Sequence, residues 1–359
     1  MLPAIASAQA PARPSAGAGL EYRTLGKTGL RVTTVGYGCM ITSDPTVIAR
    51  AVDMGINYYD TSRNYQNGQN ERMVGAALGA RRKSIYLASK SSDNPSTGPG
   101  ILAEIETSLK ELNTDYLDVW HLHGLGKPAE ISDELVAAAF KAKQQGKIRF
   151  VGVSTHNLPA IVDRVIEAKI EVVQPMYNFA SDKSYGPALE KLHAAGVGLV
   201  AMKVMARAGR RGQQQPGRPP AFISAALKWA INNPAIATTV PSMTDIEQLE
   251  QNFKAMAERF TDSDAKILTA RLEDIRPYFC RMCGRCEGQC PKGLPVADML
   301  RFLSYHDFYG DYHFAVVSFR DLAREVRDVR CSDCDTCAIR CPNGVHVQDR
   351  LIRAQQLLA

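Results

Sequence analysis

Eight of the nine cysteines in this chain of 359 residues lie near its C-terminus, in two runs with the same spacing. The first run is Cys280-x2-Cys283-x2-Cys286-x3-Cys290-Pro291, and the second is Cys331-x2-Cys334-x2-Cys337-x3-Cys341-Pro342. Thiolates at this spacing are typical of bacterial proteins that hold two 4Fe–4S clusters, in which the fourth cysteine of each run reaches the other cluster. The spacing therefore predicts one cluster on Cys280, Cys283, Cys286 and Cys341, and a second on Cys331, Cys334, Cys337 and Cys290.

Zinc and disulfide bonds are the alternative uses of such cysteines. Zinc binds Cys-x2-Cys pairs, but its sites seldom use four cysteines in so dense a run and do not need the proline that follows. A disulfide framework suits a small secreted chain, whereas the 45% of hydrophobic residues here can build a sizeable core. Both alternatives are therefore disfavoured. The ninth cysteine, Cys39, stands alone and is interpreted as a small buried residue rather than a ligand.

The length of the chain suggests two domains, or one large barrel with an appendage. Charged residues make up 22% of the chain, and this fraction, with the apolar content, excludes disorder for most of it. The 43 Lys and Arg residues exceed the 37 Asp and Glu residues only slightly and are scattered, so no nucleic-acid partner is indicated. The chain has no run of about 18 apolar residues, so no membrane span is predicted.

Residues 1–19 are rich in Ala, Pro, Ser and Gly, contain no acidic residue and show no periodicity. The simplest interpretation is a disordered tail. Ala8-Gln9-Ala10 also fits the small-residue pattern of a signal-peptidase site, although a charged start and a full apolar stretch are missing. The expected compartment is therefore the cytoplasm, with the periplasm as the alternative if this segment is the remnant of an export signal.

From about residue 31 onward, short β-branched runs alternate with amphipathic stretches. Strands are expected at Val32–Gly38, Asn57–Asp60, Ser84–Ser89, Tyr116–Leu122, Arg149–Val153, Val172–Gln174, Gly198–Met202 and Ile236–Val240. Helices are expected at 44–55, 70–79, 100–113, 132–146, 158–168, 186–195, 220–232 and 244–259. Helix starts are indicated at Asp44-Pro45, Ser132-Asp133, Asn157-Leu158-Pro159 and Thr244-Asp245, and helix ends at Gly55, Gly146 and Gly196.

Strands that alternate with helices favour a parallel sheet, and eight such units are typical of a (β/α)8 barrel, or TIM barrel. A doubly wound open sheet is the alternative, but Gly36-Tyr37-Gly38-Cys39 lacks the third glycine of a dinucleotide-binding turn. We therefore expect an α/β fold with the barrel at residues 20–275. The cysteine-rich domain would follow at 276–359 and be mainly α-helical, with helices at 296–305 and 318–328.

A barrel of this kind carries its catalytic residues at the C-terminal ends of its strands. Four polar residues occupy such positions: Asp60 closes the second expected strand, Tyr65 follows in the loop, Lys90 closes the third strand and His123 the fourth. Each alone has a simpler interpretation, as a cap, a loop aromatic, a solvated lysine or a rim histidine. Their joint placement at one mouth favours a catalytic site.

These side chains suit the reduction of a carbonyl group, which needs a hydride on carbon and a proton on oxygen. Tyr65 can give the proton, because a nearby ammonium such as that of Lys90 favours the phenolate and lowers the pKa of a tyrosine. Asp60 can hold and balance Lys90, and His123 can orient the substrate oxygen through a hydrogen bond. In alcohol oxidation Tyr65 would act as the base.

The order of these residues resembles the aldo-keto reductases over about residues 20–270. The similarity includes Gly55-Ile56-Asn57-Tyr58-Tyr59-Asp60-Thr61, Gln174-Pro175-Met176-Tyr177-Asn178 and Val240-Pro241-Ser242. The resemblance implies that Asp60, Tyr65, Lys90 and His123 form a catalytic tetrad and that a nicotinamide cofactor, NADP or NAD, lies across the barrel mouth. It also implies cofactor contacts from Ser154 and Gln174 at the carboxamide, and from Ser242, Met243, Thr244, Gln248, Gln251 and Asn252 around the adenosine and its phosphates.

Three departures from the family pattern bear on the cofactor. Thr155 follows Ser154 where the family usually has an asparagine. Thr244 stands where the family often has an arginine for the 2′-phosphate of NADP, and Asp245 after it would repel that phosphate, so NAD is credible beside NADP. Met202-Lys203-Val204-Met205 stands where the family often has an aromatic ring that stacks on the nicotinamide. Lys203 is interpreted either as a ligand of the pyrophosphate or as a solvated rim lysine.

The stretch Ala206–Pro219, which carries several arginines, lacks periodicity. It is interpreted either as a solvated loop or as a segment that holds the cofactor phosphates or closes over them. The cysteine module has a long insert, Pro291–Arg330, and so resembles the α-helical ferredoxin type that a subgroup of the aldo-keto reductases carries.

The combination predicts an NAD(P)-dependent oxidoreductase that acts on a small molecule, an aldehyde, ketone or sugar carbonyl, and carries two 4Fe–4S clusters. A redox partner protein is a further candidate, because the clusters move one electron at a time whereas a nicotinamide moves a hydride. The alternative is an electron-transfer or regulatory protein whose barrel binds the cofactor with little turnover. The complete tetrad favours the enzyme.

Overall fold

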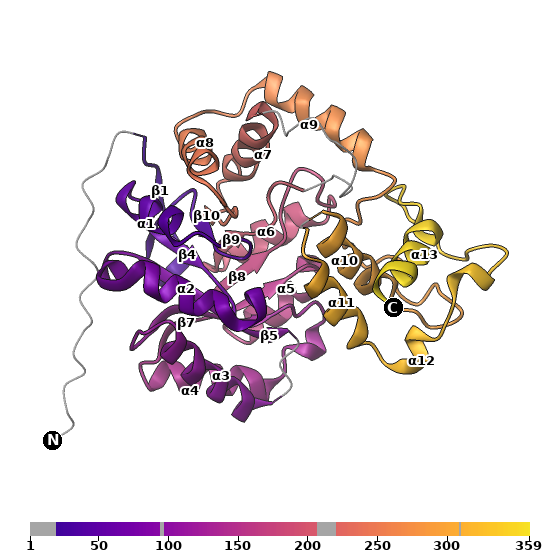
Figure 1. Cartoon of the computed structure of the whole chain (residues 1–359), viewed down its shortest axis with the longest axis horizontal. Coiled ribbons are helices and arrows are strands. Elements are labelled where there is room, and N and C mark those ends of the chain that lie inside the picture. The colour runs from indigo at the N-terminus through magenta and orange to yellow at the C-terminus, as the bar shows by residue number, and fades with distance from the viewer. Residues whose placement is uncertain (1–18, 94–96, 207–219, 309) are drawn as a thin grey trace.

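A computed structural model of the chain describes residues 19–93, 97–206, 220–308 and 310–359. Parallel strands stand at its centre, helices surround them, and the C-terminal helices lie against one side of the barrel (Figure 1). The expectations for residues 1–18 and for 207–219 fall outside the described residues. Among the helices of the described residues, none is long and apolar enough to cross a membrane.

The central sheet has eight strands that pair in the order in which they occur in the sequence. They are β3 (Tyr37–Gly38), β4 (Tyr58–Asp60), β5 (Tyr86–Asp93), β6 (Leu117–His123), β7 (Ile148–Thr155), β8 (Val172–Pro175), β9 (Gly198–Ala201) and β10 (Thr238–Thr239). Bridges between Val35 and Thr239 and between Gly38 and Ser242 bring the first and last strands together. The prediction of a (β/α)8 barrel is therefore confirmed.

A helix lies between each strand and the next, and one follows the last strand. These helices are α1 (Pro45–Asp53), α2 (Gln69–Leu78), α3 (Gly98–Glu111), α4 (Asp133–Gln144), α5 (Leu158–Glu167), α6 (Tyr185–Ala194), α7 (Pro220–Asn232) and α8 (Ile246–Met256). Three of the predicted starts are true caps, because the side chains of Asp44, Ser132 and Asp245 accept backbone N–H groups of α1, α4 and α8. Gly55 and Gly146 follow α1 and α4 with φ values of 92° and 76°, a backbone region that favours glycine.

The first predicted strand, Val32–Gly38, is wrong in part. β1 (Tyr22–Thr24) and β2 (Arg31–Thr33) form an antiparallel hairpin, and only β3 of that stretch belongs to the barrel. The hairpin lies near the start of β9, and Leu25 joins the apolar cluster inside the barrel. Asn57 fixes the hairpin through hydrogen bonds of 2.8 Å with backbone groups of β2. A β-branched run predicts an extended backbone but does not specify its partner.

The C-terminal part contains α9 (Asp262–Ile275), α10 (Val296–Asp307), α11 (Tyr312–Arg320), α12 (Arg324–Arg327) and α13 (Val347–Leu358). The helix expected at 296–305 is confirmed by α10. The helix expected at 318–328 is wrong, because α11 ends at Arg320 and the backbone of Ala323 is extended, with φ −52° and ψ 143°, before α12 begins. Helices α9 and α13 were not predicted.

The cysteine-rich domain has an apolar core separate from that of the barrel. Side chains of α10, α11 and α13 fill this core, among them Leu303, Phe319 and Leu351. A smaller apolar cluster joins the two parts: Phe279 and Phe308 pack there with barrel residues. The first cysteine loop therefore lies beside the barrel mouth.

Candidate active site and cluster-binding loops

A buried ion pair lies at the C-terminal ends of β4 and β5. The Lys90 ammonium contacts both carboxylate oxygens of Asp60, at 2.7 and 2.6 Å, and donates to the carbonyl oxygen of Thr61 at 2.8 Å. Lys90 is 0% exposed and Asp60 is 3% exposed. Burial of two charges is costly unless each is paired and fully hydrogen-bonded, and three acceptors around one ammonium meet that condition.

The rings of Tyr65 and His123 lie close to this ion pair and to each other. The Lys90 Nζ atom lies 5.0 Å from the centroid of the Tyr65 ring, and the Tyr65 and His123 ring centroids are 6.4 Å apart at an interplanar angle of 82°. Nδ1 of His123 lies 3.1 Å from the carbonyl oxygen of Ser91. The structure thus brings all four predicted catalytic residues together at one mouth. Because a carbonyl oxygen only accepts, this contact places a proton on Nδ1.

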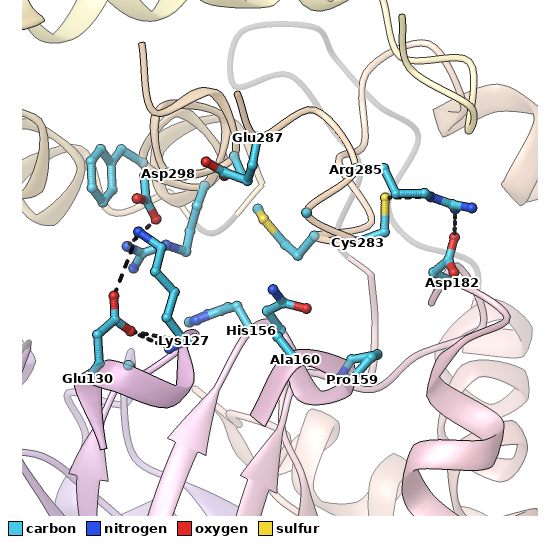
Figure 2. A pocket seen from close by; sticks show the side chains of 18 of the residues that line it. Lys127, Glu130, His156, Pro159, Ala160, Asp182, Cys283, Arg285, Glu287 and Asp298 are labelled. Carbon is cyan, nitrogen blue, oxygen red and sulfur yellow. Dashed lines mark hydrogen bonds and ion pairs between the residues drawn. The ribbon is translucent and has the colours of Figure 1, made fainter. Parts of the chain in front are cut away.

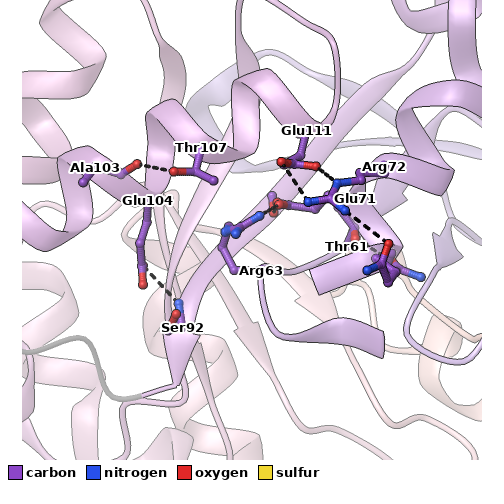
Figure 3. Close-up of polar contacts among 12 residues, drawn as sticks. Thr61, Arg63, Glu71, Arg72, Ser92, Ala103, Glu104, Thr107 and Glu111 are labelled. Atoms are coloured by element: carbon purple, nitrogen blue, oxygen red, sulfur yellow. Dashed lines mark hydrogen bonds and ion pairs between the residues drawn. The ribbon is translucent and has the colours of Figure 1, made fainter. Parts of the chain in front are cut away.

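Polar contacts fix the segment that carries Tyr65 (Figure 3). Glu71, 0% exposed, accepts a hydrogen bond from Ser89 Oγ at 2.6 Å and pairs with Arg63. Thr61 Oγ1 donates to the amide oxygen of Asn70 at 2.6 Å. These residues tie the loop after β4 to α2 and β5. Sequence reasoning assigned them no role, because their chemistry is visible only once the loop has folded.

A cavity beside the tetrad unites several of the predicted cofactor residues. Its lining comes from the ends of β3, β4 and β9, from the segment after β10 and from α8. The predicted site residues on its wall are Asp60, Tyr65, Lys203, Ser242, Gln248 and Asn252. Met243 is 0% exposed and belongs to the barrel core, with its carbonyl oxygen held by Tyr37 and Thr42. Met243, Thr244 and Gln251 are not part of this wall.

Two buried amides at the mouth fit a nicotinamide cofactor. The side chain of Gln174, at the end of β8, is 0% exposed, and both its amide atoms lack a hydrogen-bond partner. Asn252 Oδ1 is likewise buried and unpaired. Unpaired buried amides are costly and rare, so each calls for a ligand group. Ser154 Oγ, by contrast, accepts from the backbone N–H of Gly124 at 3.0 Å. Gln174 is thus the better placed of the two residues expected at a carboxamide.

The polar side chains at the N-terminus of α8 form hydrogen bonds with one another. Gln248 Nε2 donates to Thr244 Oγ1 at 2.8 Å and also contacts the Asp245 carboxylate. Asp245 accepts the backbone N–H of Gln248 at 2.8 Å. A carboxylate therefore lies at the helix terminus where a 2′-phosphate would be expected.

A cleft of about 680 Å³ lies between the barrel mouth and the first cysteine loop (Figure 2). His156, at the end of β7, lines it, and its Nε2 atom lies 2.9 Å from Lys203 Nζ. The same ammonium lies 4.4 Å from the ring centroid of Tyr305 on α10. Lys203 therefore lies between the cavity beside the tetrad and the cysteine-rich domain. Burial, followed by the charges of Lys203, Arg301 and His123, holds the pKa of His156 well below its usual value.

The eight cysteines gather into two sets. Burial, and then the charges of Cys286, Cys283 and Cys341, raise the pKa of Cys280 to about 12. Burial, and then the charges of Cys290, Cys334 and Cys337, raise the pKa of Cys331 to about 11. These neighbours are the two ligand sets that the spacing predicts. Each set offers the four thiol donors that a 4Fe–4S cluster takes, so the donor sets fit iron–sulfur clusters.

The two ligand sets lie in different surroundings. Cys280 and Met282 pack against the apolar cluster inside the barrel, so the first set faces the mouth. The second set, with Cys290 and Cys331, lines a smaller cavity together with Leu294 and Leu351 of the cysteine-rich domain. Cys39 is buried in the barrel core, in agreement with its interpretation as a packing residue.

The fold and the site together define a (β/α)8 oxidoreductase that carries a helical, cysteine-rich domain. The Aldo/keto reductase family matches residues 43–222 and 221–273, and a 4Fe-4S dicluster domain matches residues 279–346. The chain therefore belongs to the aldo/keto reductase family and carries a C-terminal 4Fe–4S domain. The resemblance seen in the sequence is confirmed.

Relatives and solved structures agree with this assignment. The uncharacterized oxidoreductase YqkF of Bacillus subtilis is 29% identical over 295 residues, which are 69% of this chain and 95% of that protein. L-galactose dehydrogenase of Arabidopsis thaliana is 28% identical over 283 residues, 67% of this chain and 89% of that protein. The holo form of aldo-keto reductase AKR11C1 from Bacillus halodurans superposes with a TM-score of 0.60 at 25% identity, covering 70% of this chain and 96% of that one. A Klebsiella pneumoniae aldo-keto reductase in complex with NADPH shares the fold, with a TM-score of 0.59, 24% identity and coverage of 70% and 95%.

Proposed function

We propose that the protein is an NAD(P)-dependent oxidoreductase that interconverts a carbonyl group and its alcohol, with Tyr65 as the acid and base. The observation that carries this proposal is the buried Lys90–Asp60 pair beneath the Tyr65 ring, with His123 opposite. The adjoining cavity and the unpaired amide of Gln174 support a nicotinamide site at the same mouth.

The nicotinamide, when bound, supplies the hydride in reduction and accepts it in oxidation. In reduction the Tyr65 hydroxyl gives its proton to the substrate oxygen, and the Lys90 ammonium stabilises the phenolate that remains. Asp60 keeps Lys90 in place. His123 would orient the substrate oxygen through a hydrogen bond from its ring. Gln174 would bind the carboxamide and so orient the ring.

The proposal includes NAD as well as NADP. Asp245 and Thr244 stand at the start of α8, and a carboxylate there disfavours a 2′-phosphate by like-charge repulsion. Asp245→Ser should therefore strengthen binding of NADPH and leave that of NADH nearly unchanged. Fluorescence titration of both nucleotides with wild-type protein and this variant measures the change.

The cysteine-rich domain is proposed to hold two clusters on the two sets of thiolates. Anaerobic purification should yield iron and acid-labile sulfide near eight atoms each per chain, as two 4Fe–4S clusters require. Recovery of one or two zinc ions instead would overturn this part of the proposal. A one-electron partner protein is proposed as the external donor or acceptor of the clusters.

Tyr65→Phe tests the chemistry, with Tyr59→Phe as the matched control. Tyr59 is a buried tyrosine on β4 whose hydroxyl has no hydrogen-bond partner. A suitable panel is L-galactose, L-glyceraldehyde 3-phosphate and methylglyoxal, the substrates that name three relatives. We expect kcat/KM to fall by about 10²–10⁴ in Tyr65→Phe and to change little in the control. Equal turnover in Tyr65→Phe would remove Tyr65 from this role.

A second function has a specific observation in its favour. A probable voltage-gated potassium channel subunit beta of Arabidopsis thaliana is 24% identical over 300 residues, 66% of this chain and 91% of that protein. That name describes a channel subunit rather than an enzyme. Tight nucleotide binding without turnover of any carbonyl or alcohol would favour an electron-transfer or regulatory role for the present chain.

A further inference from the structure

The two cysteine runs have the same spacing but different side chains between the ligands. Arg285 precedes the third cysteine of the first run, where the second run has Thr336. Asn343 lies two residues after Cys341, a position that Lys292 occupies after Cys290. Thr336 and Lys292 can also donate hydrogen bonds, so the two runs are distinguished by the contacts that these side chains make. Lys292 in fact donates to a backbone carbonyl, that of Arg330, at 3.2 Å.

The sulfur of Cys283 receives two side-chain hydrogen bonds. Arg285 Nε donates to it at 3.4 Å, and Asn343 Nδ2 donates to it at 3.4 Å. Both donors therefore converge on one sulfur of the first ligand set. The first ligand set therefore carries directed donors, and the second serves as a natural comparison inside the same domain.

A barrel residue holds both donors in place. Asp182, in the segment between β8 and α6, is 7% exposed. Its Oδ2 atom accepts from Arg285, as Figure 2 shows. The same atom accepts from Asn343 at 3.3 Å. Its Oδ1 atom accepts from the backbone N–H of Ser184 at 3.1 Å and from the Ser184 hydroxyl at 2.8 Å. Asp182 is therefore fixed from the barrel side and presents one oxygen to the two groups that bind Cys283.

We propose that Asp182 is a positioning residue through which the barrel raises the reduction potential of the first cluster. Hydrogen bonds to cluster sulfurs are among the factors that set the potential. The reduced cluster carries one more negative charge than the oxidised one, so donors on a ligand sulfur stabilise the reduced form. The step concerned is the gain of one electron by the cluster, with no bond made or broken. This inference rests on the proposal that the domain holds two clusters.

The test uses the full chain with both clusters, titrated anaerobically with dithionite and followed by electron paramagnetic resonance. Cys283→Ser identifies the signal of the first cluster, because it changes a ligand of that cluster alone. Asn343→Leu removes one donor without changing charge, and Asp182→Ala releases both donors. We expect the first cluster to become harder to reduce in both variants. In Asp182→Ala the expected change is about tenfold in the one-electron equilibrium, which corresponds to about 59 mV.

Asp182→Asn separates position from charge. Its amide oxygen still accepts from Arg285 and Asn343, so a positioning role predicts a smaller change than in Asp182→Ala. A role through charge alone predicts the opposite sign: loss of the carboxylate would make the cluster easier to reduce in both variants. The second cluster should titrate as in wild type throughout. Unchanged potentials, equal shifts of both clusters, or easier reduction in Asp182→Ala would each overturn the proposal.

The iron and sulfide contents distinguish this failure from failure of the proposal on which it rests. A preparation with one cluster or none contradicts the two-cluster proposal and is detected before any potential is measured. Hydride transfer by the barrel is assayed separately and is not a readout of this test. A full complement of iron in each variant also shows that the domain has folded.

Discussion

The barrel and the cysteine-rich domain are stabilised in different ways. The barrel has a continuous apolar core that runs from the strands to the surrounding helices, and its backbone forms an eight-stranded ladder. The domain has a small core of three helices, and long segments on either side of its cysteines lack regular structure. A small core rarely stabilises a domain alone, whereas metal–ligand bonds contribute directly to folding. The barrel should therefore fold without iron, and the domain should not.

Loss of a cluster ligand tests most directly whether the cysteine-rich domain needs iron to fold. In Cys286→Ala we expect loss of the first cluster and unfolding of residues 276–359. The bonds between thiolates and cluster are expected to supply the folding free energy that the small apolar core does not. Both tryptophans, Trp120 and Trp229, lie in the barrel, so their fluorescence reports on it alone. Amide hydrogen exchange should show lost protection in the domain, while tryptophan emission stays native.

Cys39→Ala is the matched control, since Cys39 is buried in the barrel and lies outside both runs. It should keep its iron and its protected domain. Native protection of residues 276–359 in a Cys286→Ala protein that lacks the first cluster would show that the helical core is stable without that cluster, against this expectation.

Lys90→Met tests the buried ion pair that is proposed to support catalysis in the barrel. Removal of Lys90 leaves the Asp60 carboxylate buried without its partner, which typically costs about 3–5 kcal/mol. Urea titration followed by tryptophan fluorescence measures the loss. The double variant Lys90→Met with Asp60→Asn should recover most of the stability but none of the activity. Recovery of activity in the double variant would contradict the proposed role of the pair.

Phe308→Ala tests how the cysteine-rich domain packs against the barrel. Phe308 is 8% exposed and packs against Phe279 in the cluster that joins domain and barrel. Truncation of a buried phenylalanine costs about 3–5 kcal/mol, and contact with only one small cluster favours the low end. Exchange protection around residue 279 should fall. Val317→Ala, at a side chain that is 41% exposed, should leave protection unchanged. Equal effects of the two changes would argue against docking through Phe308.

Local signals in the sequence predicted most of the barrel. The helix caps Asp44, Ser132 and Asp245 bond to backbone groups within a few residues, so the local sequence predicts them without knowledge of the tertiary structure. The catalytic candidates could be found because parallel strands end at one edge, which places Asp60 and Lys90 side by side once the strands are known. The candidate cysteine ligands were proposed from their spacing alone.

What the sequence did not predict depends on distant partners. The stretch Arg31–Thr33 looks like a barrel strand, yet Asn57 and β1 draw it into a hairpin. Helix α13 was not predicted, and its apolar side chains are buried by packing against α10 and α11. Asp182 carries no motif, and its contact with Arg285 joins residues more than a hundred positions apart. Such contacts are set by packing, for which one sequence gives no local signal.

The smallest effect concerns two buried histidines of the barrel. Burial, and then the charges of Lys90 and His123, hold the pKa of His121 well below its usual value. The pKa of His156 is lowered in the same direction. In the unfolded chain each ring titrates near a pKa of about 6.5. Below that pH the unfolded state binds more protons than the folded state, so the free energy of unfolding falls as the pH falls.

His121→Asn tests this reasoning by removing one of the two titrating rings. Stability is fully present above pH about 6.5, and each ring contributes a slope of up to about 1.4 kcal/mol per pH unit below it. Urea titrations of tryptophan emission at pH 7, 6 and 5 measure the slope for the barrel alone. The variant should lose stability at every pH because it changes a packed side chain, but its slope should be flatter than that of wild type. An unchanged slope would mean that His121 is protonated in the folded barrel, which its burial beside Lys90 argues against.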